Sequence, residues 1–133
     1  MTLPPYTTRI YFDDTDAAGI VYHANYLRIF ERARNDSFLA AGFDHLENYQ
    51  DTGESFVVSS IAIDYKSPAR LGDVVNILST MEYVGKVRIN IGQTMVLDGK
   101  VLAKLSGILV WVGSNGKPKR MTADMIQLIS NLR

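Results

Sequence analysis

The sequence contains no cysteine and only two histidines, His23 and His45. The absence of cysteine excludes disulfides, thiolate zinc sites and cysteine nucleophiles, and it suits the reducing cytoplasm, where we expect the protein. Two histidines are too few for a histidine metal site, and no ligand cluster stands out, so we expect neither a metal nor another cofactor. Fourteen Lys and Arg residues balance fourteen Asp and Glu residues, which argues against nucleic acid as the main partner.

Long apolar runs are also missing, since none approaches the ~20 residues that cross a bilayer. The chain begins Met-Thr-Leu-Pro-Pro, which lacks the basic region and apolar stretch of a signal peptide. The 133 residues are 47% hydrophobic and 21% charged, an ordinary globular composition. A chain of this length buries about two-thirds of its unfolded surface, so we expect a single domain over residues 1–133.

The spacing of apolar residues predicts one long helix among strands. Residues 6–12 alternate between two faces, as in a short strand. Over residues 24–41 the apolar side chains recur every three or four positions, which is typical of an amphipathic helix with a wide apolar face. The segment 43–55 is polar and irregular, and no element is expected there. Further strands are expected over residues 56–65, 74–84, 87–97 and 101–112, followed by a short C-terminal helix containing Met125, Leu128, Ile129 and Leu132.

This order of elements favours an α+β fold. The last three strands follow one another through short turns, one of them Asp98-Gly99, so they should pair antiparallel. A helix with a broad apolar face needs a sheet to cover it. We expect a curved five-stranded antiparallel sheet wrapped around one long central helix, with Lys104 facing solvent. The residues expected to face the helix from one strand are Val87, Ile89, Ile91, Met95 and Leu97.

The predicted sheet also bears on assembly. One helix cannot cover both faces and both edges of a five-stranded sheet, and exposed edges are a liability unless they are paired. We therefore expect a homodimer or a dimer of dimers, that is, a homotetramer.

Three aspartates and a glycine lie in residues 13–26, between the first strand and the helix. Acids there are often merely solvated, or favour the start of the helix. Here Val21, Tyr22 and Tyr26 follow closely, which predicts a partly buried carboxyl group whose pKa is raised, and hence a better base or nucleophile. The free N–H groups at the helix start favour developing negative charge. A carboxylate beside such an oxyanion site is a minimal apparatus for acyl transfer.

No Ser-His-Asp spacing or Gly-x-Ser-x-Gly motif is present, so hydrolysis would be driven by a carboxylate. Residues 14–26, Asp-Thr-Asp-Ala-Ala-Gly-Ile-Val-Tyr-His-Ala-Asn-Tyr, resemble the signature of the 4-hydroxybenzoyl-CoA thioesterase family of hotdog-fold proteins. They are most similar to its YbgC-like branch, the acyl-CoA thioesterases associated with the Tol-Pal system. Residues 30–34 and 64–73 agree with the same branch, and the resemblance extends over residues 6–118.

The resemblance implies the hotdog fold and hydrolysis of acyl-CoA thioesters at a site between two subunits. It places the catalytic aspartate on Asp16, and on His23 the backbone N–H that polarises the thioester carbonyl. The His23 side chain either lines the same pocket or is hydrogen-bonded locally. Asp14 is interpreted as a loop-shaping or capping acid and Asp13 as a solvated one. The sequence leaves open whether Asp16 is a nucleophile or a general base acting through water.

The same motif and the nearby cations supply candidate substrate-binding residues. Gly19 permits a tight turn that brings the backbone close to substrate. Asn25 is as plausible a helix cap as a ligand contact, and Tyr26 lies on the apolar stripe of the helix, where core packing is the more common role. Cations should lie near the CoA phosphates, although such residues are usually only solvated; Lys86, Lys117, Lys119 and Arg120 are further candidates of this kind. The substrate-binding residues that we predict are Gly19, Val21, Tyr22, Asn25, Tyr26, Lys66, Arg70 and Arg88.

Two other functions compete with the thioesterase. A hotdog dehydratase acting on hydroxyacyl chains ranks low, because His23 precedes the helix and His45 lies in a polar segment. A non-catalytic module that binds acyl-CoA or an acyl carrier protein would keep the pocket and lose the chemistry. Acyl carrier protein is also a possible partner of the enzyme itself. The acyl group, whether short, aromatic or long, is not specified by the sequence.

Overall fold

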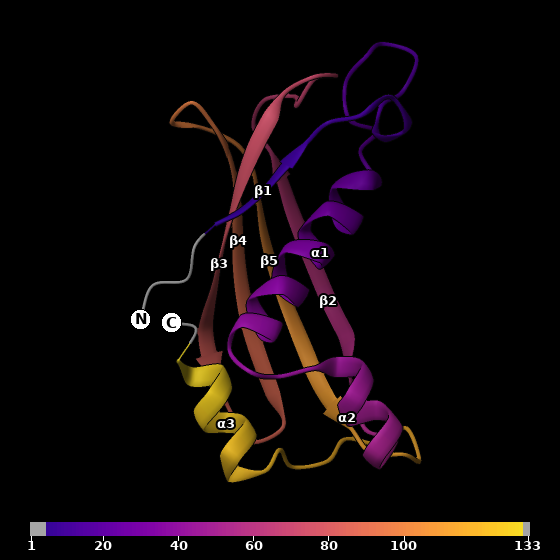
Figure 1. Cartoon of the computed structure of the whole chain (residues 1–133), viewed down its shortest axis with the longest axis vertical. Coiled ribbons are helices and arrows are strands. Elements are labelled where there is room, and N and C mark those ends of the chain that lie inside the picture. Colours follow the sequence, from indigo (N-terminus) through magenta and orange to yellow (C-terminus); the bar gives the residue numbers. More distant parts are fainter. Residues whose placement is uncertain (1–4, 132–133) are drawn as a thin grey trace.

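The computed structural model describes residues 5–131, which form one sheet and three α-helices (Figure 1). Leu132, which we predicted in the C-terminal helix, lies outside the described residues. The described residues also leave out residues 1–4, on which the expectation about a signal peptide partly rests. A short 3-10 helix spans Phe12–Asp14. The other elements are β1 (Tyr6–Arg9), α1 (Asn25–Ala40), α2 (His45–Thr52), β2 (Ser55–Tyr65), β3 (Val74–Val84), β4 (Arg88–Leu97), β5 (Lys100–Val112) and α3 (Ala123–Ser130).

The strands form a single sheet in the order β1-β3-β4-β5-β2. Every neighbouring pair is antiparallel. The four long strands curve behind α1, which crosses one face of the sheet diagonally (Figure 1). The predicted α+β architecture, with a five-stranded antiparallel sheet around one long helix and a short C-terminal helix, is therefore confirmed.

The core lies between α1 and the inner face of the sheet. From the helix, Phe30 and Ala33 are fully buried. Burying one large apolar side chain contributes about 1.5–3 kcal/mol, so this face accounts for much of the stability of the helix. Gln93 interrupts the apolar row of β4, and its amide Nε2 donates a 2.8 Å hydrogen bond to the Phe30 carbonyl oxygen. Of the row predicted to face the helix, Ile89, Ile91 and Met95 are buried and Val87 and Leu97 are half-buried, while Lys104 is exposed as expected.

The segment 43–55, for which no element was expected, contains α2. This prediction was wrong because six of the eight residues of α2 are polar and none of the eight is buried, so the apolar pattern of the sequence is too sparse to indicate a helix. Its ends are fixed by local hydrogen bonding instead. The Asp44 side chain accepts a hydrogen bond from the Glu47 N–H at 3.1 Å, an N-cap. Gly53, with φ of 71°, ends the helix in the left-handed conformation.

The first strand is shorter than the predicted residues 6–12. The chain leaves the sheet after Arg9 and enters the 3-10 helix. The Tyr11 N–H donates to the Asp14 carboxylate at 2.9 Å, so a side chain takes the hydrogen bond that a strand partner would take. Phe12 therefore continues the alternation in sequence but is exposed.

The two edges of the sheet differ. β1 covers only the start of β3, where Tyr6 pairs with Ile77, and α3 packs near the other end of β3 (Figure 1). β2 pairs with β5 along its length. Within residues 5–131, no strand pairs with the outer side of β2. The longest open edge of the sheet is therefore β2.

Candidate functional site

The loop between the 3-10 helix and α1 folds into a tight turn around Asp16. The Asp16 N–H donates to the Ile20 carbonyl at 2.9 Å, and the Gly19 N–H donates to the Asp16 carbonyl at 3.1 Å. Gly19 has a φ of 78°, a conformation that L side chains avoid, so the predicted turn at this glycine is confirmed. The Asp16 carboxylate accepts a 2.8 Å hydrogen bond from the Ala18 N–H, which fixes its position beside the turn.

Main-chain hydrogen bonds hold this loop against the turn that follows β2. The Val21 N–H donates to the Ala69 carbonyl at 2.8 Å, and the Leu71 N–H donates to the Gly19 carbonyl at 2.9 Å. Two segments far apart in the sequence are thus tied together side by side. This contact brings Asp16 and the residues after β2 into one site.

Asp14 shapes the loop from within, as predicted. One carboxylate oxygen accepts the hydrogen bond from Tyr11, and the other lies 3.2 Å from the Arg28 guanidinium. The Asn25 side chain donates to the Asp14 carbonyl oxygen at 3.0 Å. Asn25 therefore anchors the loop and does not cap α1, whose N-cap residue is Ala24. Asp13 is exposed, as expected of a solvated acid.

A pocket of about 390 Å³ opens where the loop, the start of α1 and the end of β2 meet. Five residues predicted for the site lie on its wall, and four lining residues were missed. The predicted ones are Asp16, Val21, His23, Tyr26 and Lys66; the missed ones are Ile20, Tyr65, Ser67 and Pro68.

Two tyrosines form the aromatic wall of this pocket. The rings of Tyr26 and Tyr65 meet edge to face with centroids 5.2 Å apart. Tyr26 is buried, and its hydroxyl accepts a 3.0 Å hydrogen bond from the Ala69 N–H. Burial raises the pKa of Tyr26, an effect that the hydrogen bond from Ala69 partly opposes. The side chain thus belongs both to the core and to the pocket wall. The only sequence signal for Tyr65 is its place in the family-like stretch 64–73.

The two predicted catalytic residues are exposed in the single chain. The expectation of a partly buried carboxyl at Asp16 was wrong here, because Val21 and Tyr26 turn into the core while Asp16 caps its own loop. The His23 N–H donates to no atom among residues 5–131, so it is free to meet a ligand. The His23 ring lies 4.5 Å from that of Tyr22.

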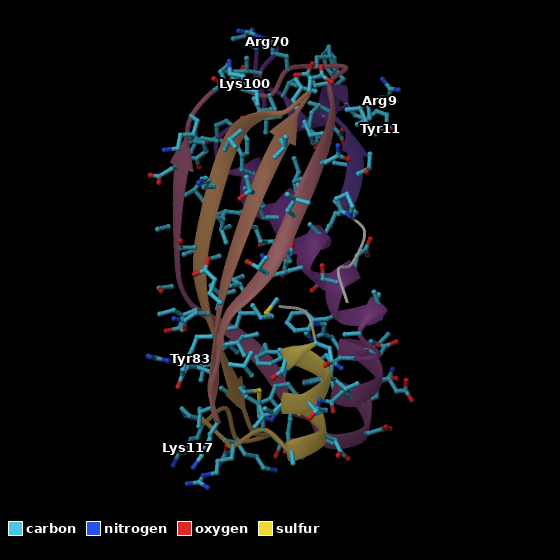
Figure 2. All side chains as sticks on the ribbon, turned by 90° about the vertical axis from the view of Figure 1, so that its left-hand side faces the viewer. Arg9, Tyr11, Arg70, Tyr83, Lys100 and Lys117 are labelled. Carbon is cyan, nitrogen blue, oxygen red and sulfur yellow. The ribbon has the colours of Figure 1, made fainter. Side chains whose placement is uncertain are left out.

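The remaining predicted residues lie outside the pocket. Gly19, Tyr22 and Asn25 belong to the loop and the helix start beside it. Arg70 is exposed near the same end of the molecule (Figure 2). The Arg88 guanidinium lies 5.5 Å from the ring of Tyr83, which Figure 2 shows toward the opposite end. Within one chain, Arg88 is therefore not brought together with the site.

Residues 5–131 contain no group of three or more His, Asp or Glu side chains placed to hold a metal ion. None of the helices formed by these residues is long and apolar enough to cross a membrane. The pocket wall carries the Asp16 carboxylate, the Lys66 ammonium, the Ser67 hydroxyl and two tyrosines, and the free N–H of His23 lies beside them.

Comparison with known proteins gives consistent matches. The family model of the thioesterase-like superfamily matches residues 10–129. The acyl-CoA thioesterase YbgC of Haemophilus influenzae is 34% identical over 99 residues, which cover 74% of this chain and 73% of that protein. The acyl-CoA thioesterase YbgC of Helicobacter pylori is 41% identical over 81 residues, 59% of this chain and 56% of that protein. The predicted likeness to the YbgC-like branch is confirmed.

Solved structures agree along nearly the whole chain. A hypothetical protein from Aquifex aeolicus superposes with a TM-score of 0.87 at 27% identity, covering 94% of this chain and 98% of that one. A probable thioesterase from Bartonella henselae gives a TM-score of 0.84 at 26% identity, covering 89% and 98%. The architecture is the hotdog fold, as the sequence predicted.

Proposed function

Because the chain belongs to the thioesterase-like superfamily, we propose that it hydrolyses an acyl-CoA thioester to the free acid and CoA. The observation that carries this proposal is the pocket itself, whose wall holds both the Asp16 carboxylate and the residue His23 with its free N–H. The two similar YbgC proteins are named as acyl-CoA thioesterases, which supports the same substrate class here.

The chemistry divides between these two groups. The His23 N–H, at the start of α1, donates to the thioester oxygen and stabilises the negative charge that develops there. Asp16 follows one of two routes. Either it attacks the carbonyl carbon to give a mixed anhydride that water then hydrolyses, or it takes a proton from a water that attacks. In both routes the C–S bond breaks, CoA leaves as a thiolate that takes up a proton, and the acid is released.

The pocket wall supplies binding. Tyr26, Tyr65 and Val21 offer apolar surface to the acyl group or to the arm of CoA. Lys66 lines the pocket and is exposed, and Arg70 follows in the same turn. We assign these two cations to the CoA phosphates. Gly19, Tyr22 and Asn25 support the loop that carries Asp16, and no metal or other cofactor takes part.

Assembly into a homodimer completes the proposal. β2 is an open edge, and the pocket lies at its end, where Tyr65 and Lys66 are. If two β2 strands pair antiparallel about a two-fold axis, the opposite end of the second copy comes beside the pocket. That end carries Arg88, so any contact between this cation and the substrate would have to be made across the interface. A homotetramer and a cytoplasmic location remain predictions.

A thiol-release assay tests the function. The purified protein is offered acetyl-, butyryl-, benzoyl- and palmitoyl-CoA, and the same acyl groups on acyl carrier protein, while free thiol is recorded. We expect saturable thiol release with at least one of the CoA esters. Saturable binding of acyl-CoA or acyl carrier protein without thiol release would instead identify a binding module of the same fold.

A further inference from the structure

Ser67 contributes the one hydroxyl of the pocket wall that forms no hydrogen bond within residues 5–131. Of the other two hydroxyls in the wall, that of Tyr65 donates to the His23 carbonyl oxygen, and that of Tyr26 accepts from a main-chain N–H. Ser67 is half-buried and lines the pocket. A hydroxyl can donate one hydrogen bond and accept two, so Ser67 has its full capacity available for a bound molecule.

The main chain at Ser67 is fixed on both sides. The N–H groups of Lys66 and Ser67 both donate to the Leu102 carbonyl oxygen of β5, at 2.8 and 3.0 Å. Pro68 follows in the sequence, and its ring restricts φ to about −65°. The Ser67 hydroxyl therefore projects from a framework that is in place before a ligand binds.

A short antiparallel pairing gives the position of Ser67 along the loop that leads into α1. Ile20 and Arg70 form an antiparallel bridge within it. Each step forward along one segment of such a pair is a step backward along the other. Three residues beyond Ile20 and three residues before Arg70, the register reaches His23 and Ser67. The register thus brings the Ser67 hydroxyl to the level of His23.

The His23 N–H lies on the side of the loop where Ser67 is. The Val21 N–H donates toward the turn after β2 at 2.8 Å, whereas the Tyr22 N–H donates to the Asp14 carbonyl on the other side at 3.0 Å. This is the alternation of an extended chain. The next N–H, that of His23, returns to the side of Ser67, and it donates to no atom among residues 5–131.

Asp16 lies on the opposite side of the same loop segment. Its N–H donates to the Ile20 carbonyl at 2.9 Å, while Ile20 bridges Arg70 on the other side. A serine beside the carboxylate would suit the attacking water, but this serine is beside the His23 N–H. The arrangement fits a thioester held with its carbonyl carbon toward Asp16 and its oxygen toward His23 and Ser67.

We propose that the Ser67 hydroxyl is a second donor to the thioester oxygen, beside the His23 N–H. The inference rests on the proposed thioesterase function and adds a catalytic residue to its site. When the attacking oxygen bonds to the carbonyl carbon, an electron pair moves onto the thioester oxygen, and the two donors stabilise this charge. When the C–S bond breaks, the pair returns to the C=O bond and CoA leaves as a thiolate. Ser67 keeps its proton and forms no covalent bond.

A second donor suits the chemistry of this oxygen. A carbonyl oxygen has two lone pairs, and hydrogen bonds to it strengthen as negative charge develops. The His23 N–H occupies one of these positions. Because the main chain of Ser67 is already fixed by its bond to Leu102, the hydroxyl occupies the other with little reorganisation.

Thiol release by the Ser67→Ala variant tests this role. The substrate is whichever of acetyl-, butyryl-, benzoyl- and palmitoyl-CoA the unaltered protein hydrolyses fastest. Loss of one oxyanion donor typically costs about 10²–10³-fold in kcat, and we expect a fall of about a hundredfold because the His23 N–H remains. KM should change less than about threefold, since the bond strengthens in the transition state. A fall in kcat of less than about tenfold would overturn the inference.

Two further variants separate the hydroxyl from the packing of the side chain. Ser67→Thr keeps a hydroxyl at the open pocket and should retain kcat within about tenfold. A loss as large as that of Ser67→Ala would overturn the inference. Ser106→Ala is the matched control, because Ser106 is exposed on β5 between two buried residues and so lies on the outer face of the sheet. It should leave kcat and KM unchanged.

The carbonyl stretch of the bound thioester reports the hydrogen bond directly. Infrared difference spectra are recorded for the same acyl-CoA bound to the Asp16→Asn chain, where turnover is slow. Adding Ser67→Ala should move the stretch to higher wavenumber, because a hydrogen bond to the oxygen weakens the C=O bond. An unmoved stretch with a reduced kcat would identify Ser67 as a holder of the attacking water and overturn the inference.

Intact-mass spectra during turnover distinguish a donor from a nucleophile. The unaltered protein should show no added acyl group on Ser67. A covalent acyl group that disappears in the Ser67→Ala chain would overturn the inference.

The two proposals fail separately. If the unaltered protein releases thiol from none of the four CoA esters, the thioesterase proposal falls and takes this inference with it. If the unaltered protein releases thiol and Ser67→Ala does so at a similar rate, only the role of Ser67 is lost.

Discussion

The Tyr65 hydroxyl donates a 2.8 Å hydrogen bond to the main-chain oxygen of His23, and so ties the end of β2 to the loop that leads into α1. The same two residues face the pocket. The His23 peptide group is thus held at its oxygen while its N–H stays free among the described residues. An oxyanion donor has to be fixed before substrate arrives, because its benefit depends on not having to reorganise.

Replacing Asp16 by asparagine should abolish most of the activity. Asp16→Asn keeps the shape of the side chain and removes the charge needed by both a nucleophile and a general base. General-base catalysis alone contributes about 10²–10⁴-fold, so kcat should fall at least about a hundredfold. KM should change little, because Asp16 is not assigned to CoA binding. Steady-state thiol release measures both constants.

The neighbouring acid and His23 provide controls. Asp13→Asn should cost far less, because Asp13 is exposed. His23→Ala should be milder than Asp16→Asn, since the proposed donor is a backbone N–H that survives the change. Near-normal turnover by Asp16→Asn together with a loss in Asp13→Asn would refute the residue assignment and leave the thioesterase proposal standing.

Removing the Tyr65 hydroxyl should loosen the proposed oxyanion donor, the His23 N–H, while the Tyr65 ring stays in the pocket wall. Tyr65→Phe keeps the ring against Tyr26 and loses the bond to His23, which should cost about 1 kcal/mol of unfolding free energy. We expect kcat to fall more than KM rises. The control is Tyr49→Phe, an exposed tyrosine on α2. Equal effects of the two changes in denaturant titrations and turnover would argue against a positioning role for Tyr65.

His45 should make the fold sensitive to mild acid. It packs among Phe38, Phe43 and Phe56, and desolvation lowers its pKa below the ordinary value near 6.5. At pH values between the lowered pKa of the folded chain and 6.5, the His45 imidazole of the unfolded chain binds a proton that the folded chain does not bind. Stability is therefore full above pH 6.5 and declines as the pH falls through that value.

The variant His45→Phe tests this linkage. It removes the titrating group, so the difference in unfolding free energy between pH 7.5 and pH 5.5 should shrink. The measurement is urea unfolding monitored by circular dichroism at both pH values. His23→Gln changes the other histidine, which is exposed, and should leave the difference intact. An unaltered difference in the His45→Phe chain would contradict the assignment to His45.

Activity should survive chelation. Attack on a thioester by a carboxylate or by an activated water needs no metal, and residues 5–131 hold no credible ligand cluster. Thiol release after treatment with EDTA should match that of untreated enzyme. Loss of activity on chelation, restored by one particular divalent ion, would count against the mechanism proposed for Asp16.

Most of the fold could be predicted because its signals are local. β3 begins and ends at the predicted residues, Val74 and Val84, since alternation stops at Gly85. The predicted helix, residues 24–41, exceeds α1 by one residue at each end. α2 was missed because six of its eight residues are polar and its ends are set by the Asp44 cap and Gly53, which apolar periodicity does not record.

The site was less predictable because side-chain direction and long-range contacts create it. The motif identified Asp16, His23 and Tyr26, but composition alone suggested burial where Asp16 turns outward. Tyr65 faces His23 only after β2 is placed beside α1, which depends on the whole sheet. Arg88 is far from the pocket because β4 begins at the opposite end of the sheet. That placement depends on how the strands are arranged, and no local sequence pattern around Arg88 indicates it.

The attachment of the Asp16 loop to the turn after β2 has a kinetic consequence. β3, β4 and β5 are joined by short connections, so their hairpins lose little entropy on closing and should form early. The bonds from Val21 to Ala69 and from Gly19 to Leu71 link distant parts of the chain, and β1 pairs only with β3. During refolding, circular dichroism should recover before thiol release does, because the pocket is among the last parts of the molecule to assemble.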